Sequence, residues 1–206
     1  MMLRRLACAL FAGLAMLGLA ACTSDDKDAG APPVIVPGGP GEPARTLAPG
    51  ERPPNPAGEP NEADVTFVSH MVVHHQQALD MAGLAPQRAS SDSVKGIAAR
   101  IADSQRVEIE ALNSWLKQHN AEHAAHDATG PMPGMATPAQ LDELKAASGP
   151  AFDALFLRLM ITHHEGALTM SHEVQGKGSN ARVQDLADEV IAVQSGEINR
   201  MRDLGH

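Results

Sequence analysis

Two stretches of the chain, HHQQALDMA at residues 74–82 and HHEGALTMS at residues 163–171, are related by a shift of 89 positions. The relation extends without a gap over residues 64–112 and 153–201. Identical pairs outside the two stretches include Asp64 with Asp153, Phe67 with Phe156, Met71 with Met160, Val94 with Val183, Ala98 with Ala187, Gln105 with Gln194, Glu108 with Glu197 and Ile109 with Ile198. Compositional bias would not bring two histidine pairs into register, so the chain contains an internal repeat.

Each repeat has the spacing of amphipathic helices, with apolar residues three and four positions apart and no alternation of period two. Asn61, Ser90 or Ser91, and the pair Thr137 and Gln140 are suited to cap helix starts. One hairpin cannot bury its apolar face alone, but two can share a core. We predict an all-α four-helix bundle over residues 61–206, made of two repeated hairpins with a pseudo-two-fold axis. Its helices would span about 62–85, 92–119, 151–175 and 180–204, with a connector at 120–149 that holds a short helix from Pro138 to about 147.

The first 60 residues indicate export and anchoring. Arg4 and Arg5 precede the apolar segment 6–20, which is too short for a comfortable membrane span, and Leu19-Ala20-Ala21-Cys22 resembles a bacterial lipobox. We predict a signal peptide over residues 1–21 and lipidation of Cys22, with the lipid as the only membrane anchor. A plain secretory signal with an incidental cysteine is the alternative. Residues 22–60, with ten prolines between Ala31 and Pro60, should form a semi-extended, disordered tether.

The composition narrows the function. With 16 Lys and Arg against 25 Asp and Glu, and with no tyrosine, the chain is a poor candidate for nucleic-acid binding. Met and His number ten each, whereas Cys22 would be the sole cysteine after signal removal. Any metal ion must therefore be held by His, Met, carboxylate or backbone oxygen.

The repeat also places potential metal ligands at matched positions. Imidazole suits copper, zinc, iron and nickel, and thioether sulfur selects Cu(I). On a helical wheel the histidine pair flanks the core-facing stripe, and its two members, about 100° apart, are not expected to share one ion from the same helix. The candidate ligands in the bundle are Met71, His74, His75, Met81, Met160, His163, His164 and Met170. His70 falls on the same edge as His74 and Met81, and Glu108 and Glu197, on the second and fourth predicted helices, are further candidates.

The connector offers a second candidate site, because His119, His123 and His126 lead into Met132-Pro133-Gly134-Met135. A Met-x-x-Met pair in a mobile Gly/Pro loop could wrap a soft ion. Three alternatives stay open. Each methionine could be core filler, the paired imidazoles could be structural and bonded to Glu108 or Glu197, and the connector could be a solvated loop.

The stretches His-His-Gln-x-Ala-x-x-Met-Ala at 74–82 and Met-Ile-x-His-His-Glu-Gly-Ala at 160–167 resemble the signatures of the domain of unknown function 305 family, over about residues 61–204. The resemblance implies a ferritin-like fold, export or lipid anchoring, and, as in some members, periplasmic copper binding through Met and His. It points to the same eight Met and His side chains of the two repeats.

Enzyme motifs fail. No Glu has a His three residues on, as a di-iron ferritin-like site needs, and Leu168 stands where a zinc protease would have its second His. We therefore expect a non-enzymatic protein, anchored by lipid to the cell membrane or outer membrane and facing the periplasm or the outside. It would bind Cu(I) or Cu(II) for buffering, resistance or delivery. A structural or partner-binding helical module of the envelope is the alternative, and an oxidase-like ferritin relative is less favoured because suitable carboxylates are few.

The anchor can be tested by Cys22→Ala, which removes the thiol that would carry the lipid. This variant should be soluble or unprocessed, as measured by cell fractionation and by labelling with a radioactive fatty acid. Unchanged membrane association and labelling would show that the anchor assignment is wrong.

Overall fold

The computed structural model describes residues 34–37, 41, 43–48, 51, 55–126, 128 and 132–205. The predicted signal peptide and Cys22 lie outside these ranges. The chain divides into two units, Met1–Pro53 and Pro54–His206. In the first, β1 (Ile35–Val36) pairs antiparallel with β2 (Arg45–Thr46). The predicted tether thus contains a short ladder, in which the apolar pair Ile35 and Val36 lies opposite Arg45 and Thr46.

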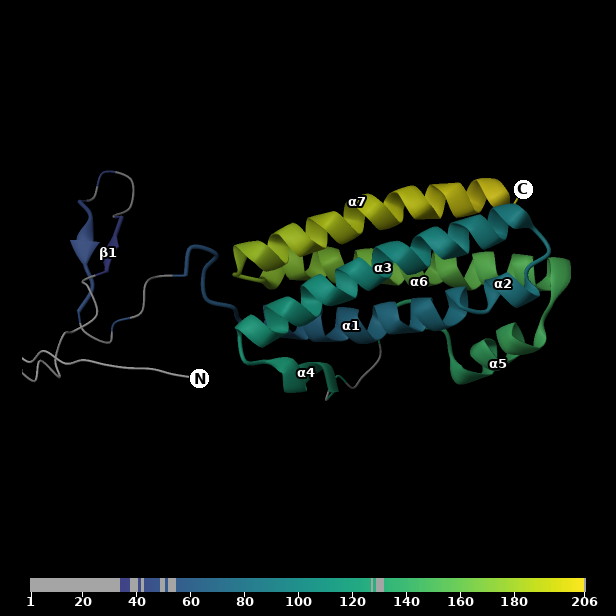
Figure 1. Cartoon of the computed structure of the whole chain (residues 1–206), viewed down its shortest axis with the longest axis horizontal. Helices are drawn as coiled ribbons and strands as arrows, with labels where there is room; N and C mark the ends of the chain where they lie inside the picture. The colour runs from purple at the N-terminus through teal and green to yellow at the C-terminus, as the bar shows by residue number, and fades with distance from the viewer. Residues whose placement is uncertain are drawn as a thin grey trace, which may run out of the picture. The chain divides into compact units, whose positions relative to one another are not determined.

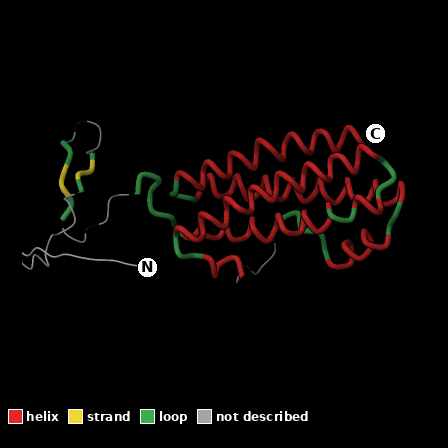
Figure 2. Tube along the Cα trace, viewed as in Figure 1, coloured by secondary structure: helices red, strands yellow, loops and turns green. Residues whose placement is uncertain are grey.

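The second unit is helical (Figures 1 and 2). Its elements are α1 (Glu62–Ala82), α2 (Ala85–Arg88), α3 (Asp92–Gln118), α4 (Glu122–His126), α5 (Pro138–Ala146), α6 (Gly149–Lys177) and α7 (Ala181–Leu204). The hairpins α1–α3 and α6–α7 pack together through contacts of α1 with α6 and of α3 with α7. The predicted four-helix bundle of two hairpins is confirmed. Within the described residues, no helix is long and apolar enough to cross a membrane.

The helix boundaries differ from the prediction in places. The first helix ends at Ala82, and the separate turn α2 follows. Gly149 and Pro150, predicted as a break, form the first turn of α6, because proline lacks only an N–H that would be unsatisfied there. Asn61 and Thr137 cap α1 and α5 through the expected capping boxes.

The domain also begins earlier than residue 61. Three backbone carbonyls just before α1 accept hydrogen bonds from the turn between α6 and α7. Ala57 O accepts from Ala181 N at 2.6 Å, Gly58 O from Asn180 Nδ2 at 2.6 Å, and Glu59 O from Ser179 Oγ at 2.9 Å. The end of the predicted tether is therefore bound to the bundle.

Two repeat-related carboxylates join the hairpins. Asp64 Oδ2 on α1 accepts hydrogen bonds from Ser179 N at 3.0 Å and Asn180 N at 3.1 Å, at the start of α7. Asp153 on α6 accepts from Ser90 N at 3.1 Å and Ser91 N at 2.9 Å, at the start of α3. Each hairpin thereby supplies a negative charge to the N-terminus of the other hairpin's second helix, where the helix dipole favours it.

The core consists of two apolar clusters with a polar layer between them. One cluster holds the C-terminal part of α1 and the N-terminal part of α6, including Ala78, Met81, Phe156 and Met160. The other holds the opposite halves of these helices. Its members are Phe67, Val68, Met71, Leu112, Trp115, Leu116, Ala167, Met170, Val174, Val183, Leu186, Ala187 and Val190. At the level between the clusters, each long helix contributes polar side chains instead.

The joining carboxylates can be tested by Asp64→Ala. Asp64 is fully buried and accepts several charge-assisted hydrogen bonds, so its loss should lower the free energy of unfolding by about 3 kcal/mol. Asp103→Ala is the control, because Asp103 is exposed and pairs only with Arg106, and it should change stability by less than ~0.5 kcal/mol. Urea denaturation measures both, and equal effects would contradict the assigned role of Asp64.

Candidate metal centre

Four histidines meet in the polar layer. His74 and His75 on α1 and His163 and His164 on α6 are all completely buried. The wheel placed the first pair on the flanks of the apolar stripe. Both members are inside because α1 is covered by α3 and by α6. The rings of His74 and His163 lie against each other, with centroids 3.8 Å apart and planes tilted by 34°.

The Nε2 atom of each imidazole has a protein partner. His75 Nε2 bonds Glu108 Oε2 on α3 at 2.6 Å, and His164 Nε2 bonds Glu197 Oε2 on α7 at 2.8 Å. These two bonds are the ones expected if the paired imidazoles are structural and bonded to Glu108 and Glu197 rather than to a metal ion.

The other two imidazoles bond backbone oxygens. His74 Nε2 donates to Pro133 O at 2.9 Å, and His163 Nε2 donates to His74 O at 2.9 Å. Because a carbonyl oxygen only accepts, Nε2 carries the hydrogen in both rings.

The Nδ1 atoms are different. Among the described residues, no hydrogen-bond partner reaches Nδ1 of His74, His75, His163 or His164. Metal-binding histidines usually donate their other ring N–H to a carboxylate or a backbone carbonyl, which fixes the tautomer and the ring orientation. All four imidazoles have this arrangement, so each presents an Nδ1 atom without a partner inside the core.

Burial keeps the central pair uncharged. Desolvation is the main cause that lowers the pKa of His74 from 6.5 to about 3; the nearby imidazoles of His75 and His164 act in the same direction, and the hydrogen bond to Pro133 O opposes the shift. Desolvation likewise holds the pKa of His163 well below 6.5. Both rings are therefore neutral near pH 7, which is the form that binds metal ions.

Gln105 and Gln194 are matched in the repeat but were not among the predicted site residues. Both are fully buried, and neither side-chain amide has a hydrogen-bond partner among the described residues. Their spacing from Glu108 and Glu197, three residues in each repeat, was the available signal. The layer thus combines four imidazoles, two carboxylates and two amides.

The methionines flank this layer. Met71, Met81 and Met160 are fully buried, and Met170 is 7% exposed. Met71 and Met170 belong to one apolar cluster, whereas Met81 and Met160 belong to the other. Within the described part of the chain, no three His, Cys, Asp or Glu side chains form a group that could hold an ion.

The connector is held against the bundle at residues 132–136. Gln77 on α1 donates to Ala136 O at 3.0 Å and accepts from Ala136 N at 2.7 Å. A side chain at Gly134 or Gly166 would overlap the backbone of the other segment. Met132 and Met135 are partly buried in this segment. His119 lies against Trp115, and His123 is exposed on α4.

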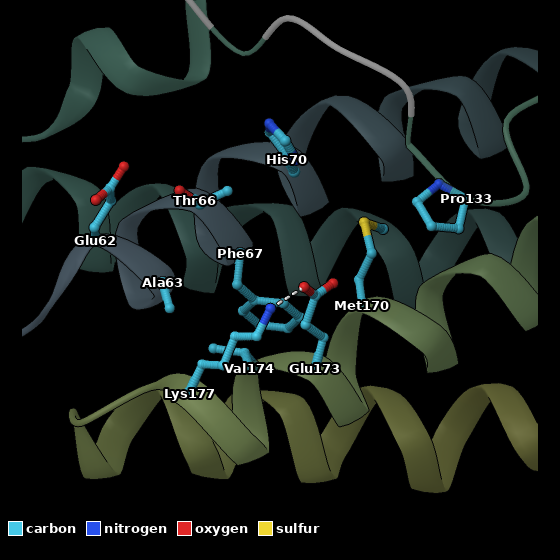
Figure 3. A pocket seen from close by; sticks show the side chains of 10 residues that line it. All are labelled: Glu62, Ala63, Thr66, Phe67, His70, Pro133, Met170, Glu173, Val174 and Lys177. Atoms are coloured by element: carbon cyan, nitrogen blue, oxygen red, sulfur yellow. Dashed lines mark hydrogen bonds and ion pairs between the residues drawn. The ribbon is translucent and has the colours of Figure 1, made fainter.

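A groove of about 430 Å³ lies between α1, α6 and Pro133 (Figure 3). Met170 lies beside Pro133, His70 lies across the groove on α1, and Glu62 lies toward the end away from Pro133; Glu173 and Lys177 form an ion pair with 2.6 Å between Oε1 and Nζ. The remaining lining residues are Ala63, Thr66, Phe67 and Val174. His70 is half-buried, so the groove brings an imidazole to the surface of the bundle, above the largely buried side chain of Met170 in the groove wall.

Comparisons with known proteins agree with this architecture. The family described as domain of unknown function (DUF305) matches residues 64–205. A DUF305 fragment from Deinococcus radiodurans is similar with a TM-score of 0.64 and 30% identity, covering 74% of this chain and 97% of that one. A candidate secreted DUF305 protein from Streptomyces coelicolor has a TM-score of 0.63 and 30% identity, with 69% and 89% covered.

CopM in its Cu(I)-bound form is also similar, with a TM-score of 0.56 and 33% identity over 68% of this chain and 94% of CopM. Other CopM structures that match contain Cu(II) or Ag. No curated protein sequence matches this chain. The family resemblance predicted from the histidine motifs is confirmed.

The low pKa of the central histidines predicts a pH dependence of stability in the metal-free protein. The unfolded chain takes up protons on His74 and His163 near pH 6.5, whereas the folded protein does so only at much lower pH. The free energy of unfolding is therefore not reduced by these two histidines above pH 6.5, and it decreases as the pH falls from 6.5 toward 3. The free energy of unfolding should fall by up to about 1.4 kcal/mol per pH unit for each histidine.

Urea denaturation between about pH 7 and pH 5 measures this slope. His74→Gln retains a donor for Pro133 and should give a shallower slope than the wild type. His123→Gln, at an exposed position on α4, is the control and should keep the wild-type slope. Identical slopes for all three proteins would mean that His74 is not held neutral.

Proposed function

This chain belongs to the DUF305 family, and we propose that it is an extracytoplasmic copper-binding protein whose buried imidazoles hold the ion. Four buried Nδ1 atoms for which no partner is found among the described residues, each on a ring whose Nε2 is already bonded, carry this proposal. The similarity to CopM, solved with Cu(I), Cu(II) and Ag, supports copper as the cargo.

The donor chemistry favours copper over other ions. Imidazole nitrogen and thioether sulfur suit Cu(I), whereas Mg²⁺ and Ca²⁺ require several oxygen ligands. Met71 and Met160 stand three residues before the two histidine pairs, so soft sulfur lies close to the imidazoles in each repeat. A monovalent ion also loses less hydration energy in a buried core than a divalent one does.

The carboxylates complete the site. Glu108 and Glu197 accept from the Nε2 atoms of His75 and His164, which makes the opposite Nδ1 a better donor to a metal ion. Their negative charge also offsets that of a bound cation.

The role we propose is storage, resistance or delivery rather than catalysis. Signal removal and lipidation at Cys22 would leave the bundle outside the cytoplasm on a proline-rich tether. The candidate secreted relative from Streptomyces coelicolor supports that location.

A second candidate function is a structural or partner-binding module, in which the imidazoles only order the core. The bonds of His75 to Glu108 and of His164 to Glu197 favour this candidate, because they satisfy one nitrogen of each ring without any ion.

Anaerobic titration of Cu(I) in competition with bicinchoninate separates the two candidates. His74→Ala combined with His163→Ala should weaken Cu(I) binding at least ~100-fold, because two donors are removed. Met132→Leu combined with Met135→Leu tests the connector and should bind as the wild type does. His172→Ala, at an exposed position on α6, is the control.

The carboxylates give a second measurement that keeps the imidazoles in place. Glu108→Gln combined with Glu197→Gln should weaken Cu(I) binding by about 10- to 100-fold, while circular dichroism shows a folded bundle. If copper stoichiometry and affinity are unchanged in the histidine and connector variants alike, the imidazoles are structural and the second candidate is correct.

A further inference from the structure

The segment Met132–Ala136, which we call the strap, separates the surface groove from the buried histidines. Pro133 lines the groove together with His70 and Met170. The carbonyl oxygen of the same residue accepts the hydrogen bond from His74 Nε2 at 2.9 Å. One residue thus faces the groove and also covers the edge of the His74 ring, behind which His163 is stacked.

The other imidazoles are covered by long helices. His75 bonds Glu108 on α3, His164 bonds Glu197 on α7, and His163 bonds a carbonyl of α1. Exposing any of these rings requires two long helices to separate. His74 differs because its acceptor belongs to the strap.

The strap is anchored at its two ends. Ala136 is buried in one apolar cluster and takes part in two hydrogen bonds with Gln77, and Met132 packs against the other cluster. The middle of the strap is held by the hydrogen bond from His74 to Pro133 O and by the close approach of backbones between Gly134 and Gly166 on α6, where neither residue has a side chain. A short exposed turn held in this way opens more readily than packed helices.

The groove offers a first binding place for a soft ion. His70 supplies an imidazole that is half exposed, and Met170 supplies a thioether next to Pro133 (Figure 3). The carboxylate of Glu62 also lines the groove and attracts a cation, whereas the charge of Glu173 is offset by Lys177, which lines the groove as well.

We propose that the groove is the loading site for copper, where His70 and Met170 bind Cu(I) first, and that displacement of the strap admits the ion to His74. This inference rests on the proposed function. It assigns to the strap the control of the rate at which copper reaches and leaves the core.

Gly166→Ala tests the strap. The new Cβ would overlap the carbonyl of Pro133 and force the strap away from α6, while alanine remains favourable in a helix. Gly176→Ala is the matched control, because it makes the same change on α6 where nothing lies within 4 Å of the new Cβ. Loading is followed by stopped-flow absorbance as Cu(I) leaves its bicinchoninate complex, and release by the reverse transfer.

Gly166→Ala should load and release Cu(I) at least ~10-fold faster than the wild type, because both rates scale with the fraction of open molecules. Gly176→Ala should match the wild type. The exposure of His74 is measured separately, in the metal-free protein. Diethyl pyrocarbonate, mapped by mass spectrometry, should modify His74 faster in Gly166→Ala than in the control.

The groove is tested by His70→Gln and Met170→Leu, each of which should slow loading about tenfold, as expected when the first bound state is less populated. If the wild type binds copper in the core but all these variants load at the wild-type rate, the ion enters elsewhere and the inference is wrong. If the wild type binds no copper in the core, the proposed function itself is wrong. In that case the diethyl pyrocarbonate result still reports whether the strap covers His74.

Discussion

The polar layer across the middle of the bundle is the constraint on which the rest of the structure depends. Each long helix places polar side chains at this level, and apolar clusters lie on both sides of it. A buried polar group without a partner costs free energy, so the bonds from His75 to Glu108 and from His164 to Glu197 fix the axial position of each helix in its hairpin. Sliding one helix by a turn would break such a bond and bring polar atoms against hydrocarbon.

Much of this architecture could be predicted from the repeat, because helical periodicity and matched His and Glu residues survive in a single sequence. The pairing of imidazoles with Glu108 and Glu197 was among the alternatives for that reason. The orientation of the rings could not be predicted, since it depends on which nitrogen meets a partner from a distant segment. Pro133 is such a partner, and it lies in a connector without periodicity. The helical wheel placed His74 and His75 on the flanks of the apolar stripe; it considers one helix alone, so it could not show that α3 and α6 together bury both side chains.

The two halves of the domain are not equivalent where the connector crosses them. Gln77 and Gly166 occupy the same position in the two repeats. Gln77 binds Ala136 with its side chain, whereas Gly166 leaves space for the backbone of Pro133 and Gly134. As a result His74 bonds the connector, while its counterpart His163 bonds a helix. A symmetric core has thus acquired one face that differs from the other.

The reciprocal contacts of Asp64 and Asp153 have the pattern of an isologous dimer interface, in which the same patch on each half receives what it gives. Two separate copies of a single hairpin could make these contacts equally well. The domain is therefore arranged as a homodimer fused into one chain, and the connector serves to keep the halves at high effective concentration. Two copies of one hairpin must carry the same substitutions, whereas two hairpins joined in one chain can each carry substitutions that the other lacks.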